Sequence, residues 1–252
     1  MSIIHPPTLS SDTLMRPHRT QPFSHRTCCA EFTGTPAEMA ATRAELAPQL
    51  PFLVMGFPKS GTSSLHSFFQ CIGLRSSQWW CKDGVQSEEV ICGKMIERNV
   101  MAGRPALANL SEWDAFAEID AFETRSTCYF PQRQALNELH AAAPTATFIL
   151  NMRNLTNWLT SVDRWHRHNL RNRMIACDQP GFPAGVGKLD SEMFEFYRSQ
   201  AQLVRDFAAT HPSHKLVEVQ IDDPEQARAA LGAAFGHGRA KKCWGEAKNV
   251  RR

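Results

Sequence analysis

The chain has 252 residues, of which 42% are hydrophobic and 21% are charged, and its formal net charge is +3. This length is typical of one α/β domain with a sizeable core. So small a net charge gives no electrostatic support for a nucleic-acid partner. Because the sequence contains no run of about 18 apolar residues, it does not predict a membrane-spanning helix, and we expect a soluble protein.

Eight cysteines are distributed along the chain without any C-x-x-C spacing. A zinc site is therefore not expected, and no other set of metal ligands is apparent. We interpret the cysteines as buried free thiols, which are usual in a reducing compartment. This interpretation favours the cytoplasm as the location of the protein.

Residues 1–48 differ in composition from the rest of the chain. The first thirty are rich in Ser, Thr, Pro, His and Arg, with Asp12 as the only acid, and they lack the apolar segment of a secretory signal. They predict a disordered tail, although an organelle-targeting segment has the same composition. A short helix predicted over 36–46 leads into a single domain over 49–252.

The apolar run 52–56 predicts a buried strand that leads directly into FPKSGTSS (residues 57–64) and a helix over 61–72. A turn of this kind points backbone N–H groups at one place, where the helix dipole adds positive potential. Gly61 lies in the turn, and Lys59 adds a full positive charge. Hydroxyl groups add further donors: Ser60, Thr62, Ser63 and Ser64. The turn is therefore predicted to bind a phosphate-containing anion.

The remaining segments alternate between strands and helices. Strands are predicted at 77–81, 147–152 and 215–221, and helices at 85–101, 111–116, 131–143, 154–170, 191–210 and 223–235. Strands separated by helices indicate parallel βαβ units, so we predict a three-layer α/β/α fold around a central parallel sheet. Ligands bind at the carboxyl ends of the strands in such folds, where Lys59 and Arg153 both fall.

A second phosphate-binding pattern follows the strand at 147–152. Arg153 ends this strand, and Ser161 lies eight residues later on a predicted amphipathic helix. Asn154 or Thr156 is expected to cap the start of that helix. A planar guanidinium and a hydroxyl in these positions can converge on one phosphate. The two patterns together, in this order, are more specific than either alone.

A nucleotide-triphosphate loop of the form G-x-x-x-x-G-K-S/T is the main alternative. Gly56 and Gly61 have the right separation, but Thr62 follows Gly61 and the lysine comes earlier, at Lys59. Such proteins also hold Mg²⁺ with an acidic residue after a second strand, whereas the strand at 147–152 ends in Arg153. A P-loop kinase acting on a small metabolite is therefore the second hypothesis.

The two patterns resemble those of the sulfotransferases that use 3′-phosphoadenosine-5′-phosphosulfate (PAPS), and the resemblance covers about residues 50–250. In that family a PKSGTT or PKSGTS loop binds the 5′-phosphosulfate, and an arginine with a serine eight residues later binds the 3′-phosphate. Weaker matches at 118–122 and 243–249 are similar to a microbial and algal branch. Ser64 stands where many cytosolic relatives have a tryptophan that stacks on adenine.

The resemblance implies a P-loop-like fold and an enzyme that moves a sulfuryl group from PAPS to a hydroxyl or amine of a small molecule or glycan, without a metal. Lys59 would neutralise charge on the leaving oxygen. The loop residues would hold the 5′-phosphate, and Arg153 and Ser161 the 3′-phosphate. Trp244 is expected to close over the nucleotide.

The general base that accepts the proton of the acceptor is less well defined. Asp120 is the first candidate and His166 the second, while His66 and Glu118 are weaker ones. Because no base is unmistakable, a protein that binds PAP or PAPS without catalysis is a third hypothesis. The acceptor and the oligomeric state are left open, although aromatic residues of the loops at 75–130 and 170–190 are expected to wall the acceptor pocket.

Overall fold

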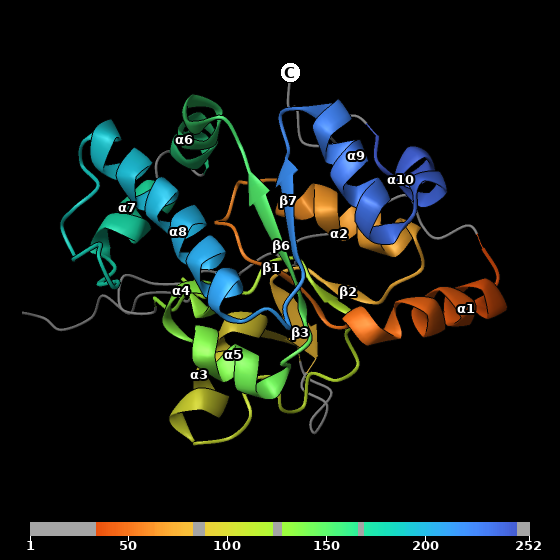
Figure 1. Ribbon diagram of the computed structural model, residues 1–252. Helices are drawn as coiled ribbons and strands as arrows, with labels where there is room; N and C mark the ends of the chain where they lie inside the picture. The colour runs from red at the N-terminus through yellow and green to blue at the C-terminus, as the bar shows by residue number, and fades with distance from the viewer. Residues whose placement is uncertain (1–33, 83–88, 123–127, 166–168, 246–252) are drawn as a thin grey trace, which may run out of the picture.

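The computed structural model describes residues 34–82, 89–122, 128–165 and 169–245. Five parallel strands form a central sheet in the order β2-β5-β1-β6-β7 (Figure 1). Their bounds are Phe52–Val54 (β1), Ser76–Ser77 (β2), Ala115–Phe116 (β5), Thr147–Met152 (β6) and Leu216–Gln220 (β7). The predicted α/β class with a parallel sheet is therefore confirmed.

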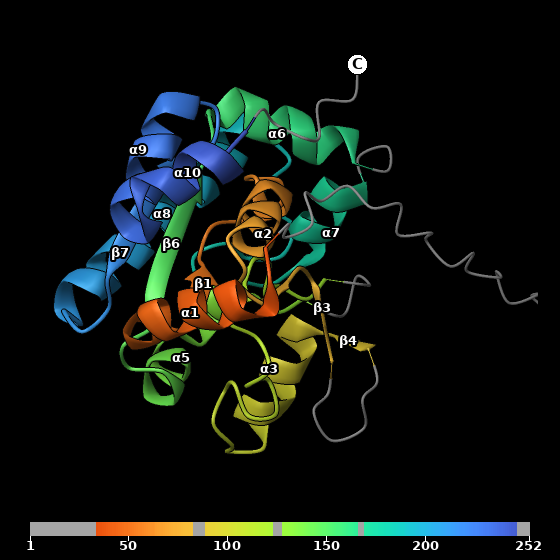
Figure 2. The same ribbon diagram turned by 90° about the vertical axis from the view of Figure 1, so that its right-hand side faces the viewer.

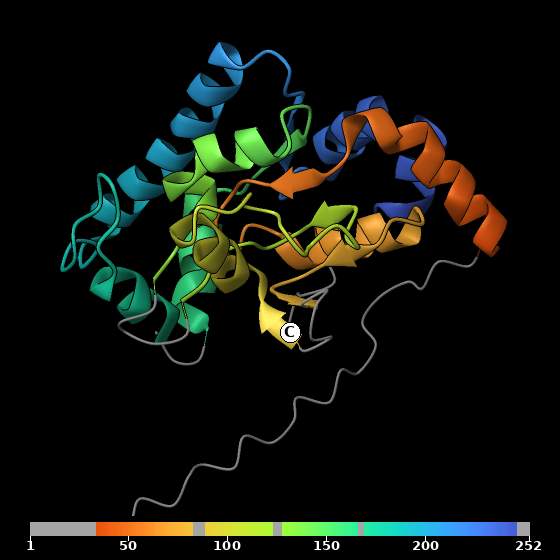
Figure 3. The same ribbon diagram turned by 90° about the horizontal axis from the view of Figure 1, so that it is seen from below.

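Helices cover both faces of this sheet because successive strand residues point to opposite faces. One face packs against α1 (Pro36–Leu46), α2 (Thr62–Cys71), α9 (Pro224–Phe235) and α10 (His237–Cys243). Figure 2 shows α2, α9 and α10 next to one another. The other face packs against α3 (Cys92–Met101), α5 (Leu136–Ala142) and α8 (Asp190–Thr210). Figure 3 shows α8 and α10 on opposite sides of the sheet.

The residues of β1 illustrate this division. Phe52 and Val54 belong to the first core, and Leu53 belongs to the second. A third apolar cluster lies beyond the carboxyl end of the sheet. It is built from α6 (Leu155–Arg164), α7 (Asn169–Ala176), the start of α8 and Phe130, which precedes the short helix α4 (Pro131–Gln134). Every strand residue of β6 is buried, as its apolar run predicts.

Most of the predicted elements are present, but the strand predicted at 77–81 is divided into β2 and a strand over 80–82, and the helix predicted at 131–143 is divided at Ala135 into α4 and α5. Three further elements differ for identifiable reasons. The helix predicted at 111–116 is wrong, because Ala115 and Phe116 form β5 between β1 and β2. A two-residue strand has no periodicity of its own and is defined only by its neighbours. The predicted helix at 85–101 begins only at Cys92, after β4 (Glu89–Ile91) pairs antiparallel with β3 (Trp80–Lys82). The segment 154–170 contains α6 and the start of a separate α7.

Helix α1 lies within the predicted N-terminal tail and contacts the domain. Thr35 caps it in a capping box. Arg43 forms an ion pair of 2.8 Å with the buried Asp114, and Glu45 pairs with Arg239 of α10 at 2.6 Å. Residues 1–33 lie outside the described residues, so the tail and the domain boundary at 48 stay predictions.

The interpretation of the cysteines as free thiols is wrong for the six that the structure describes. They form the disulfides Cys71–Cys243, Cys81–Cys92 and Cys128–Cys177, with Cα–Cα separations of 5.6, 5.0 and 5.6 Å. Cys28 and Cys29 lie outside the described residues. The expectation of a cytoplasmic location rests on free thiols, and disulfides remove that basis because they are rare in the cytosol.

Within the described part of the chain, no helix combines the length and the apolar character needed to span a membrane.

Replacing both cysteines of the Cys71–Cys243 pair with alanine is expected to lower the free energy of unfolding by about 5 kcal/mol, because the entropy removed from the unfolded chain grows with loop length. The two residues are separated by 172 positions. The matched control is the same replacement of Cys81 and Cys92, separated by 11 positions, for which we expect about 3 kcal/mol. Urea unfolding measures both losses, and equal losses would contradict the entropic account.

Candidate functional site

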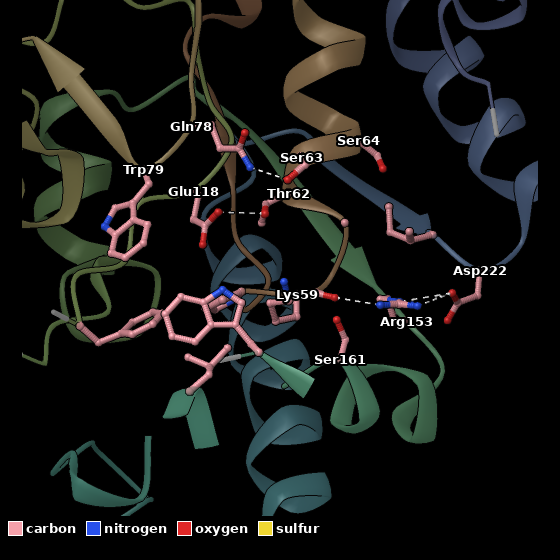
Figure 4. Close-up of a pocket in the computed structure, with 16 residues that line it drawn as sticks. Lys59, Thr62, Ser63, Ser64, Gln78, Trp79, Glu118, Arg153, Ser161 and Asp222 are labelled. Carbon is pink, nitrogen blue, oxygen red and sulfur yellow. Dashed lines mark hydrogen bonds and ion pairs between the residues drawn. The ribbon is translucent and has the colours of Figure 1, made fainter. Parts of the chain in front are cut away.

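A cavity of about 290 Å³ lies at the carboxyl edge of the sheet. All five strands lead into it: Gln78 and Trp79 follow β2, Glu118 follows β5, the loop at 58–64 follows β1, Arg153 follows β6, and Ile221 and Asp222 follow β7. Ser161 of α6 and three apolar residues complete the lining: Phe122, Trp165 and Leu170. Figure 4 shows the polar members facing one another across the cavity.

The loop between β1 and α2 is shaped to present backbone N–H groups. Lys59 has φ +67° and Gly61 has φ +86°, so two left-handed residues curve the backbone just before α2 begins at Thr62. Such a curve, followed by a helix N-terminus, forms a concave anion-binding surface. Gly61 is required twice: a Cβ atom there would be strained, and it would also lie 2.7 Å from the side chain of Ile221.

Buried side chains from other elements hold the outer side of this loop. Asn151 of β6 accepts a hydrogen bond from Gly56 N at 2.9 Å and donates one to Ser60 O at 2.8 Å. Trp158 of α6 donates from Nε1 to Pro58 O at 3.0 Å. Ser60 is fully buried, and its hydroxyl lies 3.2 Å from the hydroxyl of Tyr197. Of the predicted loop donors, Ser60 is therefore the one whose side chain does not line the cavity.

Arg153 lies on the other side of Lys59 from Trp79 and Glu118 (Figure 4). Its Nε and Nη2 donate to Asp222 Oδ1 at 3.2 and 3.1 Å, and its Nη1 donates to Lys59 O at 3.2 Å. Ser161 lines the same end, on the helix that Asn154 caps as predicted. Burial alone would raise the pKa of the Asp222 carboxyl, but hydrogen bonds from Arg153 and Asn154 lower it. Arg153 is thus held facing the cavity.

Glu118 is the carboxyl group that faces Lys59 and Thr62. Its Oε2 accepts a hydrogen bond of 2.9 Å from Thr62 Oγ1, and Figure 4 shows it above the lysine. Burial raises the pKa of Glu118, and the Thr62 hydrogen bond and the Lys59 charge only partly oppose this effect. A carboxyl with a raised pKa beside a cation in a cavity is a typical acid–base group.

Asp120 does not reach the cavity. Its relative exposure is 1%, and burial, with the charge of Glu118 added, raises its pKa well above the usual range. Among the described residues neither Asp120 Oδ2 nor the neighbouring Gln132 Oε1 has a hydrogen-bond partner. A hydrogen bond with the Gln132 side chain lowers this pKa and only partly opposes the effect of burial.

The other predicted residues lie elsewhere. Trp244 is 6% exposed and packs against Phe68 in the core of the α2 face, with ring centroids 6.1 Å apart, so it does not cover the cavity. His66 is turned to β2, where its Nδ1 lies 3.0 Å from Ser76 Oγ. His166 lies outside the described residues. In the part of the chain that the structure describes, no cluster of His, Cys, Asp or Glu could hold a metal.

Sequence reasoning missed Asp222, Ile221 and Gln78 as site residues. A signal for the first two exists, because they directly follow the predicted strand 215–221 just as Arg153 follows its own strand. Gln78 carries no such signal, since β2 has only two residues. Glu118, a weaker candidate for the base, is the carboxyl that the fold brings to the loop.

Comparison with protein families gives the class of protein. The sulfotransferase domain matches residues 52–210, which is more than half of the chain and includes both phosphate-binding patterns. The chain therefore belongs to the sulfotransferase family, and its class of activity is sulfuryl transfer. No match was found among curated proteins.

His66 predicts a pH dependence of stability. Burial lowers the pKa of its imidazole from 6.5 to about 4, although a hydrogen bond to the Ser77 backbone partly opposes this. The unfolded chain therefore binds a proton that the folded protein does not. The contribution of His66 to the free energy of unfolding is therefore fully present above pH 6.5 and is lost as the pH falls towards 4.

Asparagine does not titrate in this range. The free energy of unfolding of His66→Asn is therefore expected to fall by about 2 to 3 kcal/mol less than that of the wild type between about pH 7.5 and about pH 4.5. Urea unfolding at the two pH values measures the difference, with the exposed His237→Asn as control. An unchanged pH slope in the His66 variant would contradict the lowered pKa.

Proposed function

We propose that the chain is a PAPS-dependent sulfotransferase that modifies a hydroxyl group of a small acceptor. The observation that carries the proposal is the meeting of two cationic residues from separate strand–loop–helix units in one cavity. Arg153 Nη1 donates directly to the carbonyl oxygen of Lys59 at 3.2 Å, and Ser161 lines the same space. A doubly phosphorylated nucleotide needs two anion-binding positions side by side, and this arrangement supplies them.

The residues present fit the donor at both of its charged ends. The curved loop with Lys59, Gly61, Thr62, Ser63 and Ser64 suits the 5′-phosphosulfate, because backbone N–H groups, hydroxyls and one charge converge there. Arg153 and Ser161 suit the 3′-phosphate. Ile221, which lies against Gly61, offers an apolar surface for the adenine ring of the donor.

The residues between the two ends define the chemistry. PAPS, when bound, supplies a sulfuryl group whose bond to the 5′-phosphate oxygen breaks as the acceptor oxygen bonds to sulfur. Lys59 lies where it can neutralise the charge left on that phosphate oxygen. Glu118 takes the proton of the acceptor hydroxyl, a role supported by its position beside Thr62 and by its raised pKa. The loop and Arg153 keep the reacting groups in line.

One observation favours the kinase hypothesis. A carboxylate that accepts a hydrogen bond from a loop hydroxyl, as Glu118 does from Thr62, resembles the arrangement that holds Mg²⁺ in P-loop enzymes. Arg153 argues against it, because a second cation at this edge suits a second phosphate. Binding measurements separate the two hypotheses.

PAP is expected to bind the wild-type protein and raise its melting temperature, whereas ATP with Mg²⁺ is not. Lys59→Ala and Arg153→Ala are each expected to weaken PAP binding about 10- to 100-fold, because each removes charge-assisted hydrogen bonds. Arg164→Ala is the matched control, since Arg164 lies exposed at the end of α6. Calorimetry and thermal shift measure these effects, and preferential binding of ATP with Mg²⁺ would support the kinase instead.

Glu118→Gln is expected to lower kcat by about 100-fold or more while PAP still binds, because the proton acceptor is lost and the shape is kept. Asp120→Asn is the matched control: it replaces a buried carboxyl of the same segment, which does not line the cavity, with an amide of the same size, so turnover should change by less than about 3-fold. Labelled PAPS and a sulfated acceptor provide the assay. Full activity of Glu118→Gln would remove the assignment, and PAP binding without any turnover would favour the non-catalytic hypothesis.

A further inference from the structure

The cavity has two chemically different ends. Figure 4 shows Arg153, Asp222 and Ser161 to one side of Lys59, and Trp79 with Glu118 towards the other. Gln78 also lies on this second side, and three further lining residues are apolar and mostly aromatic: Phe122, Trp165 and Leu170. The nucleotide charges belong at the first end, so the second end is where the acceptor must enter.

Trp79 is held in an unusual position at this second end. Its φ is +57°, which is rare for a bulky residue and persists only when the surroundings impose it. Its ring stacks on Trp80 with centroids 6.1 Å apart and on Phe122 at 5.8 Å, with interplanar angles of 23° and 27°. Its carbonyl oxygen accepts from Cys92 N at 2.7 Å. The indole is therefore a fixed wall of the cavity.

The other two aromatic walls are held by one arginine of α7. The guanidinium of Arg173 lies 5.4 Å from the centre of the Trp165 ring, and its Nη1 donates to Phe122 O at 3.0 Å. Phe122 also stacks on the buried Phe130 at 5.7 Å. Arg173 does not itself line the cavity, so its charge supports the walls without facing an acceptor.

Few polar groups face this end among the described lining residues. Gln78 Nε2 donates to Ser63 Oγ at 2.5 Å, and Glu118 accepts from Thr62. The carboxylate of Glu118 can still accept a hydrogen bond from one hydroxyl group of an acceptor. A sugar ring needs partners for several hydroxyls, and each one buried without a partner is unfavourable. A flat apolar ring instead gains contact with the aromatic walls.

We propose that the acceptor is an uncharged, planar aromatic compound with a hydroxyl group, which packs against Trp79, Phe122 and Trp165 and places its oxygen at Glu118. This inference rests on the proposed function. The acceptor oxygen forms the new bond to sulfur, and its proton passes to Glu118. The bond between sulfur and the 5′-phosphate oxygen of the donor breaks, and that oxygen keeps the electron pair.

The test measures binding of naphthol and of methyl β-glucoside to the full chain by calorimetry, with and without PAP. We expect naphthol to bind the PAP-loaded protein and the glucoside not to bind. Trp79→Ala should weaken naphthol binding at least about 10-fold, and Trp79→Phe should restore most of it. Met101→Ala, which removes an exposed apolar side chain far from the cavity, should have no effect.

Turnover with labelled PAPS adds a second readout, in which Trp79→Ala should raise KM for naphthol more than it lowers kcat. Tighter binding of the glucoside, naphthol binding that is unaffected by Trp79→Ala, or no naphthol binding to a protein that binds PAP would each overturn the inference. Failure to bind PAP would instead overturn the proposed function, whatever the result with naphthol.

Discussion

The hydroxyl of Tyr197 joins the two segments predicted to bind anions, and the geometry of the site depends on this contact. It accepts a hydrogen bond of 2.7 Å from the backbone N–H of Arg153 and lies 3.2 Å from Ser60 Oγ of the loop. Asn151, two residues before Arg153, binds the same loop at both ends. These groups are buried or nearly so, and leaving one unpaired costs about 1 to 3 kcal/mol. The spacing between Lys59 and Arg153 is therefore set by the core.

The end of the cavity lined by Trp79 and Phe122 is stabilised in a different way, by covalent links and stacked rings. The Cys81–Cys92 disulfide closes the β3–β4 ribbon just beyond Trp79, and a second disulfide joins Cys177, which directly follows α7, to Cys128, which directly precedes Tyr129. Small apolar walls of this kind have few hydrogen bonds to hold them. Disulfides compensate for this by limiting the freedom of the unfolded chain.

The parts of the site that the sequence predicted best are those whose geometry is local. A strand, a curved turn with Lys59 and Gly61, and a helix need only adjacent residues to form, and Arg153 with Ser161 needs only a strand end and two helical turns. The ranking of Asp120 above Glu118 as the base had no such local support. They differ by two positions on the same segment, and only the packing of Gln132 and the loop determines which one faces the cavity.

The sequence alone determined the α/β class, the curved turn between β1 and α2, and the positions of Arg153 and Ser161 after β6, because apolar periodicity and short-range backbone geometry depend on neighbouring residues. Only the tertiary structure decided that Ala115 and Phe116 form a strand, that six cysteines pair, and that Trp244 belongs to the core. Each of these depends on contacts between segments far apart in the chain, and a local sequence pattern does not predict such contacts.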